Sequence, residues 1–162
     1  MKNSRFYIVL LAVLLGMYSC NSVTEPFKAK QASVVNDSVK KMMVSISNDV
    51  TMKGPIAWAY YFEDVPDFFM ANDGKLQLSS GDSAQYFIKN VLVLNICKIE
   101  LQWSNIRIDT YTATLASVAA NFKEYMIDVN GKMLSVAGYF TGVAQKTNSG
   151  WRLRNAHWSS AK

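Results

Sequence analysis

The chain has 162 residues and a formal net charge of +5, and 50% of its residues are hydrophobic. This length suits one domain, and the composition suits a packed core rather than a disordered segment. The basic residues are spread along the chain without a run of Lys or Arg, which argues against a nucleic-acid-binding protein. The cysteines Cys20 and Cys97 are too few and too far apart for a disulfide scaffold.

Residues 1–20 have the pattern of an export signal. A basic start precedes an apolar run over residues 6–15, which is shorter than the roughly 20 residues that a membrane span needs. A small residue directly before Cys20 resembles a bacterial lipobox, although Tyr18 stands where a small residue is usual. We therefore expect a lipidated Cys20 followed by a tether over residues 21–27. An ordinary secretory signal or an uncleaved anchor is the alternative.

These features predict an exported protein held at the bacterial cell envelope by a lipid anchor, without crossing the membrane. Residues 28–162 would form the folded domain. Cys97 lies within an apolar strand pattern, so we expect it to be a buried, inert thiol.

Two helices are predicted at the start of this domain. The first runs from about residue 28 to Asn48, because apolar residues recur there at three- and four-residue steps. Gly54 and Pro55 end it and begin a second, aromatic-rich helix over residues 56–63, which Pro66 should stop.

A third helix is predicted after two short strands at residues 68–71 and 75–79. Asp82 is expected to cap this helix, with Gln85 as its partner in a capping box. The apolar residues that follow Asp82 recur at helical spacing as far as Leu92.

After the third helix the apolar period changes from that of a helix to that of a strand. The alternation slips near Ser104 and Asn105, which predicts a bulge. Further strands are expected over residues 110–129, 133–146 and 151–160, with a tight turn at residues 130–131. This element order predicts an α+β domain in which three helices pack on one face of a strongly curved antiparallel sheet.

The last strands also carry a family resemblance. The segments concerned are Gly138-Tyr139-Phe140-Thr141-Gly142, Gly150-Trp151-Arg152-Leu153-Arg154 and Ala156-His157-Trp158-Ser159. With the element order, they make residues 28–160 resemble the nuclear transport factor two-like superfamily, and within it the SnoaL-like, secreted bacterial branch. The resemblance implies a cone-shaped, cystatin-like domain with a cavity between sheet and helices, and often a homodimer through the sheet. The superfamily includes isomerases, cyclases, dehydratases and non-enzymatic binding modules, so the fold leaves the function open.

Strand alternation predicts which side chains of the last strand face that cavity. One face would hold Trp151, Leu153, Asn155, His157 and Ser159, and its apolar members favour the concave side. The other face would hold Arg152, Arg154, Ala156 and Trp158, and the arginines and Trp158 would form an outer docking surface. His157 would then serve as a general base or ligand anchor. Alternatively, it is a packed histidine bonded to a backbone carbonyl or to Ser159.

Two carboxylates, Glu124 and Asp64, are the other catalytic candidates. Glu124 shares its strand face with Val118, Ala120 and Phe122, so it is either a pocket acid with a raised pKa or the partner of a neighbouring cation. Asp64 follows the second helix and is more typical of a turn. The candidates for lining a ligand pocket are Trp58, Tyr61, Trp103, Glu124, Asn155 and His157.

We expect an envelope-anchored domain that binds a small apolar ligand or a protein partner in its cone without turnover. An enzyme of the isomerase, cyclase or dehydratase type, using His157 with a carboxylate, is one alternative. A structural dimerisation module is another. We expect no cofactor, and no metal site because one histidine and one non-lipidated cysteine are too few ligands.

Overall fold

The computed structural model describes residues 29–161. The predicted export signal, Cys20 and the tether lie outside this range. The helical elements are α2 (Ala29–Lys53), the 3-10 turn η1 (Pro55–Ala57), α3 (Trp58–Tyr61), α4 (Gly81–Phe87), the π-helical turn η2 (Ile88–Leu92) and α5 (Val93–Asn95). The strands are β1 (Phe69–Asn72), β2 (Lys75–Leu78), β3 (Ile96–Thr112), β4 (Leu115–Asp128), β5 (Met133–Thr147) and β6 (Gly150–Ser160).

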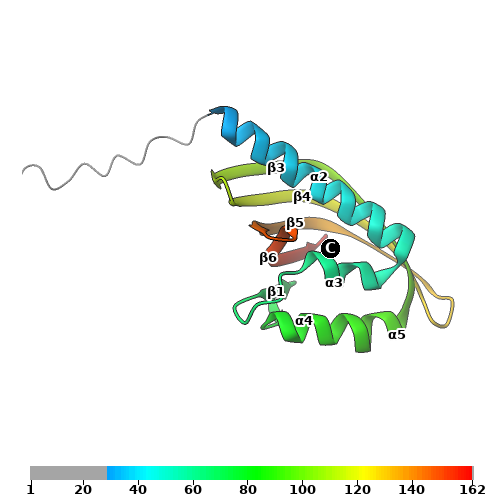
Figure 1. The fold of residues 1–162 in the computed structure, drawn as a ribbon. Helices are drawn as coiled ribbons and strands as arrows, with labels where there is room; N and C mark the ends of the chain where they lie inside the picture. The colour runs from blue at the N-terminus through cyan, green and yellow to red at the C-terminus, as the bar shows by residue number, and fades with distance from the viewer. Residues whose placement is uncertain (1–28, 162) are drawn as a thin grey trace, which may run out of the picture.

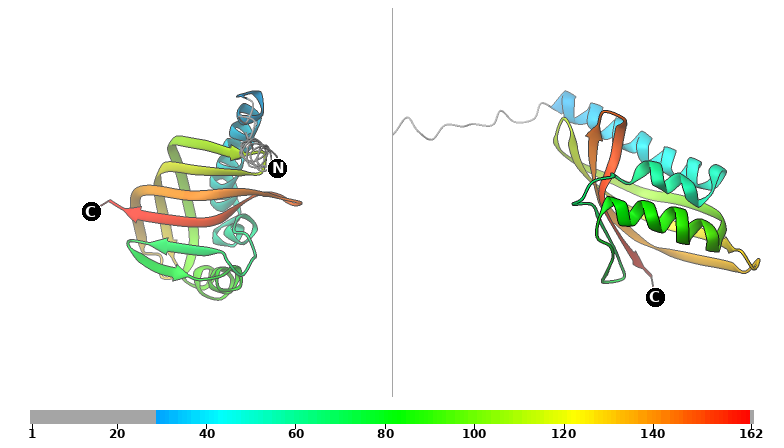
Figure 2. Two further views of the ribbon diagram at one scale, coloured as in Figure 1. Left: turned by 90° about the vertical axis from the view of Figure 1, so that its left-hand side faces the viewer. Right: turned by 60° about the horizontal axis from the view of Figure 1, so that its bottom comes forward.

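The strands form one curved sheet in the order β2-β1-β6-β5-β4-β3. Neighbouring strands are antiparallel except for β1 and β6, which are parallel. The helices lie on one face of the sheet, with α2 along β3 and α4 beside β1 (Figure 1). α4 contacts β2, and α5 contacts the β3 strand that follows it. Figure 2 shows the strands in front of the helices when the sheet is seen from its other side. The predicted α+β layout is confirmed.

The predicted apolar stripe of the first helix is buried against the sheet. Its buried residues are Val35, Val39, Met42, Met43, Ile46 and Val50. The helix continues beyond the predicted end at Asn48 to Lys53, because Val50 prolongs the stripe. Gly54, with a φ of 79°, then turns the chain, and Pro55 begins η1 as predicted.

The second predicted helix is shorter than expected. α3 ends at Tyr61, well before Pro66, because Phe62 adopts an extended conformation and forms a parallel bridge with Leu153. Glu63 continues this pairing by donating its backbone N–H to the carbonyl of Leu153 at 2.9 Å. Competition from the edge of β6 therefore ends the helix.

The cap of α4 is Ser80 rather than Asp82. The Ser80 hydroxyl accepts the backbone N–H of Ser83 at 3.1 Å, and the Ser83 hydroxyl accepts the N–H of Ser80 at 3.0 Å. Serine thus fills both positions of the capping box. Gln85, the expected partner of Asp82, instead donates to the carbonyl of Ala59 at 2.9 Å and ties α4 to α3.

The predicted strand over residues 110–129 is interrupted by a turn. β3 runs to Thr112, and β4 starts at Leu115. The sequence there lacks the glycine, proline or asparagine that usually marks a turn. Instead, the Thr112 hydroxyl accepts the backbone N–H of Thr114 at 3.1 Å.

Two other sequence signals in the sheet are confirmed. The register of β3 against β4 shifts between Ser104 and Arg107, where Asn105 has a φ of 52°. The turn between β4 and β5 contains Gly131 with a φ of 78°.

Cys97 is exposed, which contradicts its predicted burial. The register against β4 also shifts between Ile96 and Lys98. This irregularity takes Cys97 out of the alternation that buries Ile99 and Leu101.

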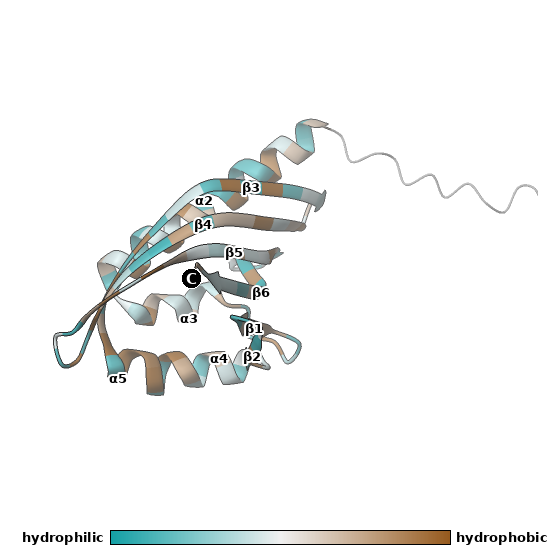
Figure 3. Cartoon of the chain, turned by 180° about the vertical axis from the view of Figure 1, so that it is seen from behind, coloured by the Kyte–Doolittle hydropathy of each residue, from teal (hydrophilic) through white to brown (hydrophobic). Residues whose placement is uncertain are grey.

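A single cluster of apolar side chains fills the space between sheet and helices. Phe68, Phe140, Met43 and Ile46 are among its largest fully buried members. Apolar and polar residues alternate along β3 and β4, so one face of each strand joins this cluster (Figure 3). Within residues 29–161, no helix combines the length and apolar character that a membrane crossing requires.

Candidate functional site

A cavity of about 410 Å³ lies between the concave face of the sheet and the α4–η2 segment. Its walls are mostly apolar and come from every strand and from α3, α4 and η2. The apolar lining residues are Trp58, Phe62, Met70, Leu78, Phe87, Ile88, Leu92, Ile99, Phe122, Met126, Val136 and Trp158. The polar lining residues are Asn72, Asp73, Gln77, Glu124 and Ser160. This volume falls within the range of small-molecule sites.

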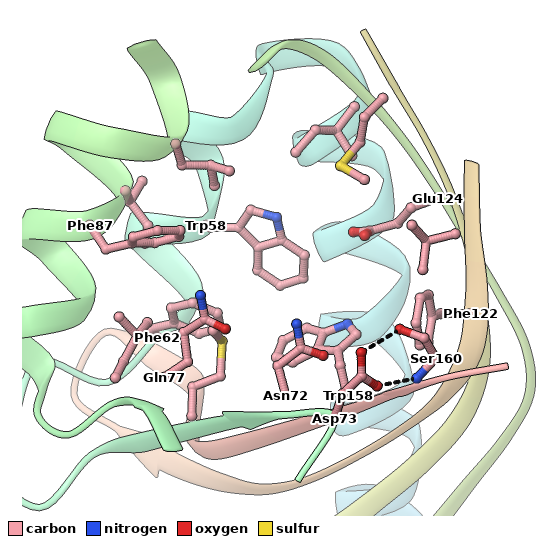
Figure 4. Close-up of a pocket in the computed structure, with 17 residues that line it drawn as sticks. Trp58, Phe62, Asn72, Asp73, Gln77, Phe87, Phe122, Glu124, Trp158 and Ser160 are labelled. Carbon is pink, nitrogen blue, oxygen red and sulfur yellow. Dashed lines mark hydrogen bonds between the residues drawn. The ribbon is translucent and has the colours of Figure 1, made fainter. Parts of the chain in front are cut away.

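Glu124 projects into this cavity from β4 (Figure 4). It follows the alternation that also buries Val118, Ala120 and Phe122. Burial raises the pKa of its carboxyl to about 7. Near neutral pH the group therefore divides between an acid that can donate a hydrogen bond and a carboxylate that can accept one.

Trp58 is the aromatic residue that faces Glu124 across the cavity (Figure 4). Its side chain is buried because it stacks on Phe62 at 5.3 Å and meets Trp158 edge-on at 5.7 Å. These contacts hold three aromatic rings in one wall. A flat apolar ligand would find a preformed surface there.

The second polar region of the cavity comes from the turn between β1 and β2. The Asp73 carboxylate accepts the backbone N–H of Ser160 at 2.7 Å and its hydroxyl at 3.0 Å (Figure 4). The adjacent Asn72 has a buried side-chain oxygen that has no hydrogen-bond partner among the described residues. A buried oxygen of this kind normally receives a hydrogen bond, so it is a natural partner for a donor on a ligand or water.

A bulge in β6 overturns the predicted faces of that strand. Val143 pairs with Asn155 but Ala144 pairs with Leu153, so the register skips Arg154. After the bulge, Ala156 and Trp158 face inward, and Trp158 contacts Phe140 at 4.8 Å.

The same bulge turns Asn155 and His157 away from the cavity. His157 pairs with Thr141, which is exposed on the outer face of β5. The Asn155 side chain accepts the N–H of Val143 at 3.0 Å and thereby satisfies the backbone at the bulge. Neither residue lines the cavity. The predicted outer docking surface is not formed either: Arg152 is buried, Arg154 pairs with Glu63 and Asp67, and Trp158 faces inward.

The remaining predicted site residues lie elsewhere. Tyr61 donates its hydroxyl to Asp49 at 2.7 Å, and burial together with this bond raises its pKa. The Trp103 ring packs against the Phe140 ring at 5.1 Å, and Trp103 does not line the cavity. Asp64 is exposed in the loop after α3. The structure therefore brings Trp58 and Glu124 together, and their role in ligand binding stays a prediction.

The sequence patterns did not predict most of the polar residues that line the cavity. Asn72, Asp73 and Gln77 belong to a short hairpin whose position depends on the pairing of β1 with β6. Trp158 was assigned to the wrong face because of the bulge.

No protein-family model matches the chain, and no curated protein matches it in sequence. Solved structures do match its fold. A candidate scytalone dehydratase from Novosphingobium aromaticivorans is 16% identical with a TM-score of 0.72, and the match covers 83% of this chain and 89% of that one. The chain has the nuclear transport factor 2-like, cystatin-like fold.

Two further structures show the range of proteins with this fold. A nuclear transport factor 2-like superfamily protein from Salmonella enterica is 17% identical with a TM-score of 0.61, over 83% of this chain and 94% of that one. A hexachlorocyclohexane dehydrochlorinase from Novosphingobium barchaimii is 11% identical with a TM-score of 0.65, over 83% of this chain and 92% of that one. At such identities the likeness concerns the fold alone.

Proposed function

We propose that the domain binds a small, mostly apolar molecule bearing a hydroxyl or amine group in the cavity around Trp58 and Glu124. The observation that carries this proposal is a buried carboxyl in a mostly apolar cavity of ligand size. Aromatic walls would hold the apolar body of the ligand. Glu124 and the unpartnered oxygen of Asn72 would fix its polar group.

Naphthol and naphthalene are suitable probes because they differ by one hydroxyl group. Both should bind and shift the indole NMR signals of Trp58 and Trp158, assigned through single Trp→Phe variants. Naphthol should bind about fivefold more tightly, since a net hydrogen bond is worth about 1 kcal/mol. Replacing Glu124 with leucine should reduce this preference.

A matched pair of substitutions tests whether the probes occupy the cavity. Val136→Phe would fill part of its wall and should weaken naphthol binding roughly tenfold or more. Val129→Phe makes the same change at an exposed position outside the cavity and should leave affinity unchanged. Equal affinities for both variants, or an absence of binding by the wild type, would refute the proposal.

The pKa of Glu124 supports a second candidate, a proton-transfer enzyme. A carboxyl with a pKa near 7 suits general acid–base catalysis, and the candidate dehydratase and the dehydrochlorinase share the fold. Because His157 and Asp64 lie outside the cavity, Glu124 would be the base. α-Tetralone, a small ring ketone, should then exchange its α-protons in deuterated water with the wild type but not with Glu124→Gln. If the wild type exchanges these protons no faster than buffer does, the enzyme candidate is rejected and only the binding proposal remains.

We also propose that Cys20 carries a lipid anchor that holds the domain at the cell envelope. The support is the apolar run followed by a small residue and Cys20. Metabolic labelling with an alkyne fatty acid should mark the wild-type protein and not Cys20→Ser. Labelling of both proteins, or of neither, would contradict this assignment.

A further inference from the structure

A second, more polar groove of about 680 Å³ lies between α2 and the turn that joins β5 to β6. It shares none of its lining residues with the cavity around Glu124. The charged and aromatic residues that line it are Lys41, Asp49, Lys53, Tyr60, Tyr61, Trp151 and Arg152.

Arg152 is the unusual member of this groove. It is only 8% exposed, and it is the one charged residue in the described chain that is buried to this degree. Its guanidinium lies over the ring of Tyr60 at 3.7 Å and donates through one terminal nitrogen to the carbonyl of Trp151 at 2.9 Å. The ion pairs formed within residues 29–161 do not include Arg152. A buried charge is normally paired, so this guanidinium lacks the anion that its burial calls for.

The charges around Arg152 leave the groove positive. Asp49 is the acidic residue in its lining, and it pairs with Lys53 at 2.9 Å. Hydrogen bonds from Lys53 and from Tyr61 lower the pKa of Asp49, so this carboxylate stays ionised and its charge is offset by Lys53. Lys41 and Arg152 remain as two positive charges without a carboxylate partner among the described residues.

The geometry of Arg152 suits a carboxylate in particular. Contact with Tyr60 and the hydrogen bond to Trp151 both restrict the guanidinium, and this hydrogen bond uses one of its five N–H donors. The edge formed by Nε and the other terminal nitrogen matches the two oxygens of a carboxylate. Trp151 is half-buried in the same lining and offers a flat surface for the body of a ligand.

We propose that this groove binds a small organic carboxylate through Arg152, with Lys41 as a second positive charge and Trp151 against the body of the ligand. The site is separate from the cavity of the proposed function and does not depend on it. The chain would thus carry two ligand sites of different chemistry on the same side of its sheet.

The four tryptophans make the two sites distinguishable in one experiment. Trp151 lines the groove, and Trp58 and Trp158 line the cavity, whereas Trp103 lines neither. Benzoate, titrated into the full-length chain in detergent micelles, should shift the indole NMR signal of Trp151 and leave those of Trp58 and Trp158 in place. Benzamide, which has the same ring without the charge, should produce no comparable shift.

Two substitutions connect this signal to the proposed contacts. Arg152→Met should weaken benzoate binding roughly tenfold or more. Because Arg152 is buried, Lys41→Glu provides a second variant at an exposed position that should fold normally and also weaken binding. Naphthol shifts at Trp58 and Trp158 should persist in Lys41→Glu, which separates a failure of the groove from a failure of the cavity.

Several results would overturn the proposal. They are an unchanged Trp151 signal, equal shifts with benzoate and benzamide, benzoate shifts at Trp58 or Trp158 instead, or unchanged affinity in Lys41→Glu. Tighter binding of inorganic phosphate than of benzoate would overturn the assignment to an organic carboxylate.

Discussion

At the scale of single residues, Glu124 sets the chemistry of the cavity and also lowers the stability of the fold. Its pKa is about 7 in the folded chain against an ordinary value of 4.5. Between these pH values the unfolded chain loses a proton that the folded chain keeps, so folding stability falls as the pH rises through this window. A difference of this size corresponds to about 3 kcal/mol at most.

Glu124→Gln should remove this loss. The free energy of unfolding of the variant should equal that of the wild type at about pH 4 and exceed it by roughly 1–3 kcal/mol at about pH 8. Urea unfolding at both pH values measures the difference. Glu100→Gln is the control. Glu100 lies on β3, next to β4, and accepts a hydrogen bond from Gln102 of its own strand. This variant should show the same change of folding stability between the two pH values as the wild type. If the wild type and Glu124→Gln lose equal stability between the two pH values, ionisation of Glu124 does not destabilise the fold.

Gly138 allows the backbone of β6 and the ring of Phe122, which lines the cavity, to approach β5 closely. A Cβ atom at this position would lie 2.0 Å from the backbone oxygen of Ser159 and 3.0 Å from the ring of Phe122. The backbones of β5 and β6 must therefore move apart, and the Phe122 ring must also give way by a small amount.

Gly138→Ala should therefore destabilise the fold by about 2 kcal/mol, a typical cost of overpacking. The urea midpoint should fall, and naphthol binding should weaken because Phe122 lines the cavity. Thr141→Ala, at an exposed position on the same strand, should change little. A Gly138→Ala protein with wild-type stability would show that the two strands separate without cost.

At the scale of elements, success in predicting the site depended on whether a strand kept its alternation. β4 pairs with β5 without a register shift from Leu115 to Ile127, so alternation placed Glu124 on the concave face. β6 contains a bulge stabilised by Asn155, a contact that only the paired strand reveals. The error at His157 and Trp158 thus arose from one skipped residue.

The cap of α4 offers a test at the same scale. Ser80→Ala removes a hydroxyl that accepts the Ser83 N–H and should cost about 1 kcal/mol of folding stability. Asp82→Ala should cost less than about 0.5 kcal/mol, because Asp82 is exposed in the first turn and stabilises the helix only through its dipole. Thermal unfolding of the two alanine variants gives the comparison. A larger loss for Asp82→Ala than for Ser80→Ala would show that Asp82 is the cap.

At the scale of the whole molecule, the layer arrangement could be predicted from the order of helical and strand periods. The cavity could not, because its lining comes from every strand and three helical elements. Asn72 and Gln77 reach it only because β1 pairs with β6, far along the chain. No local pattern in a short hairpin specifies such a partner.

The face of the sheet away from the helices leads us to propose a homodimer. Its outward residues on β4 and β5 include the exposed Asn121, Ala137, Tyr139 and Thr141. Wild-type protein should sediment as a dimer, and Ala137→Arg should sediment as a monomer because it places a charge in the middle of this face. Lys75→Glu, at the edge strand β2, should remain dimeric. A wild-type monomer at the highest soluble concentration would exclude this interface.

The position of β6 between β5 and β1 has a consequence for how the chain reaches its folded state. The last of the six strands to be synthesised fills a place inside the sheet, and its Ser160 bonds to Asp73, a residue 87 positions earlier. The β1–β2 hairpin has no neighbour in the sheet until β6 has emerged. Closing so long a loop is slow compared with forming local hairpins. The nascent domain should therefore stay open until β6 is available, which is the condition that a chain needs to pass through a translocation channel.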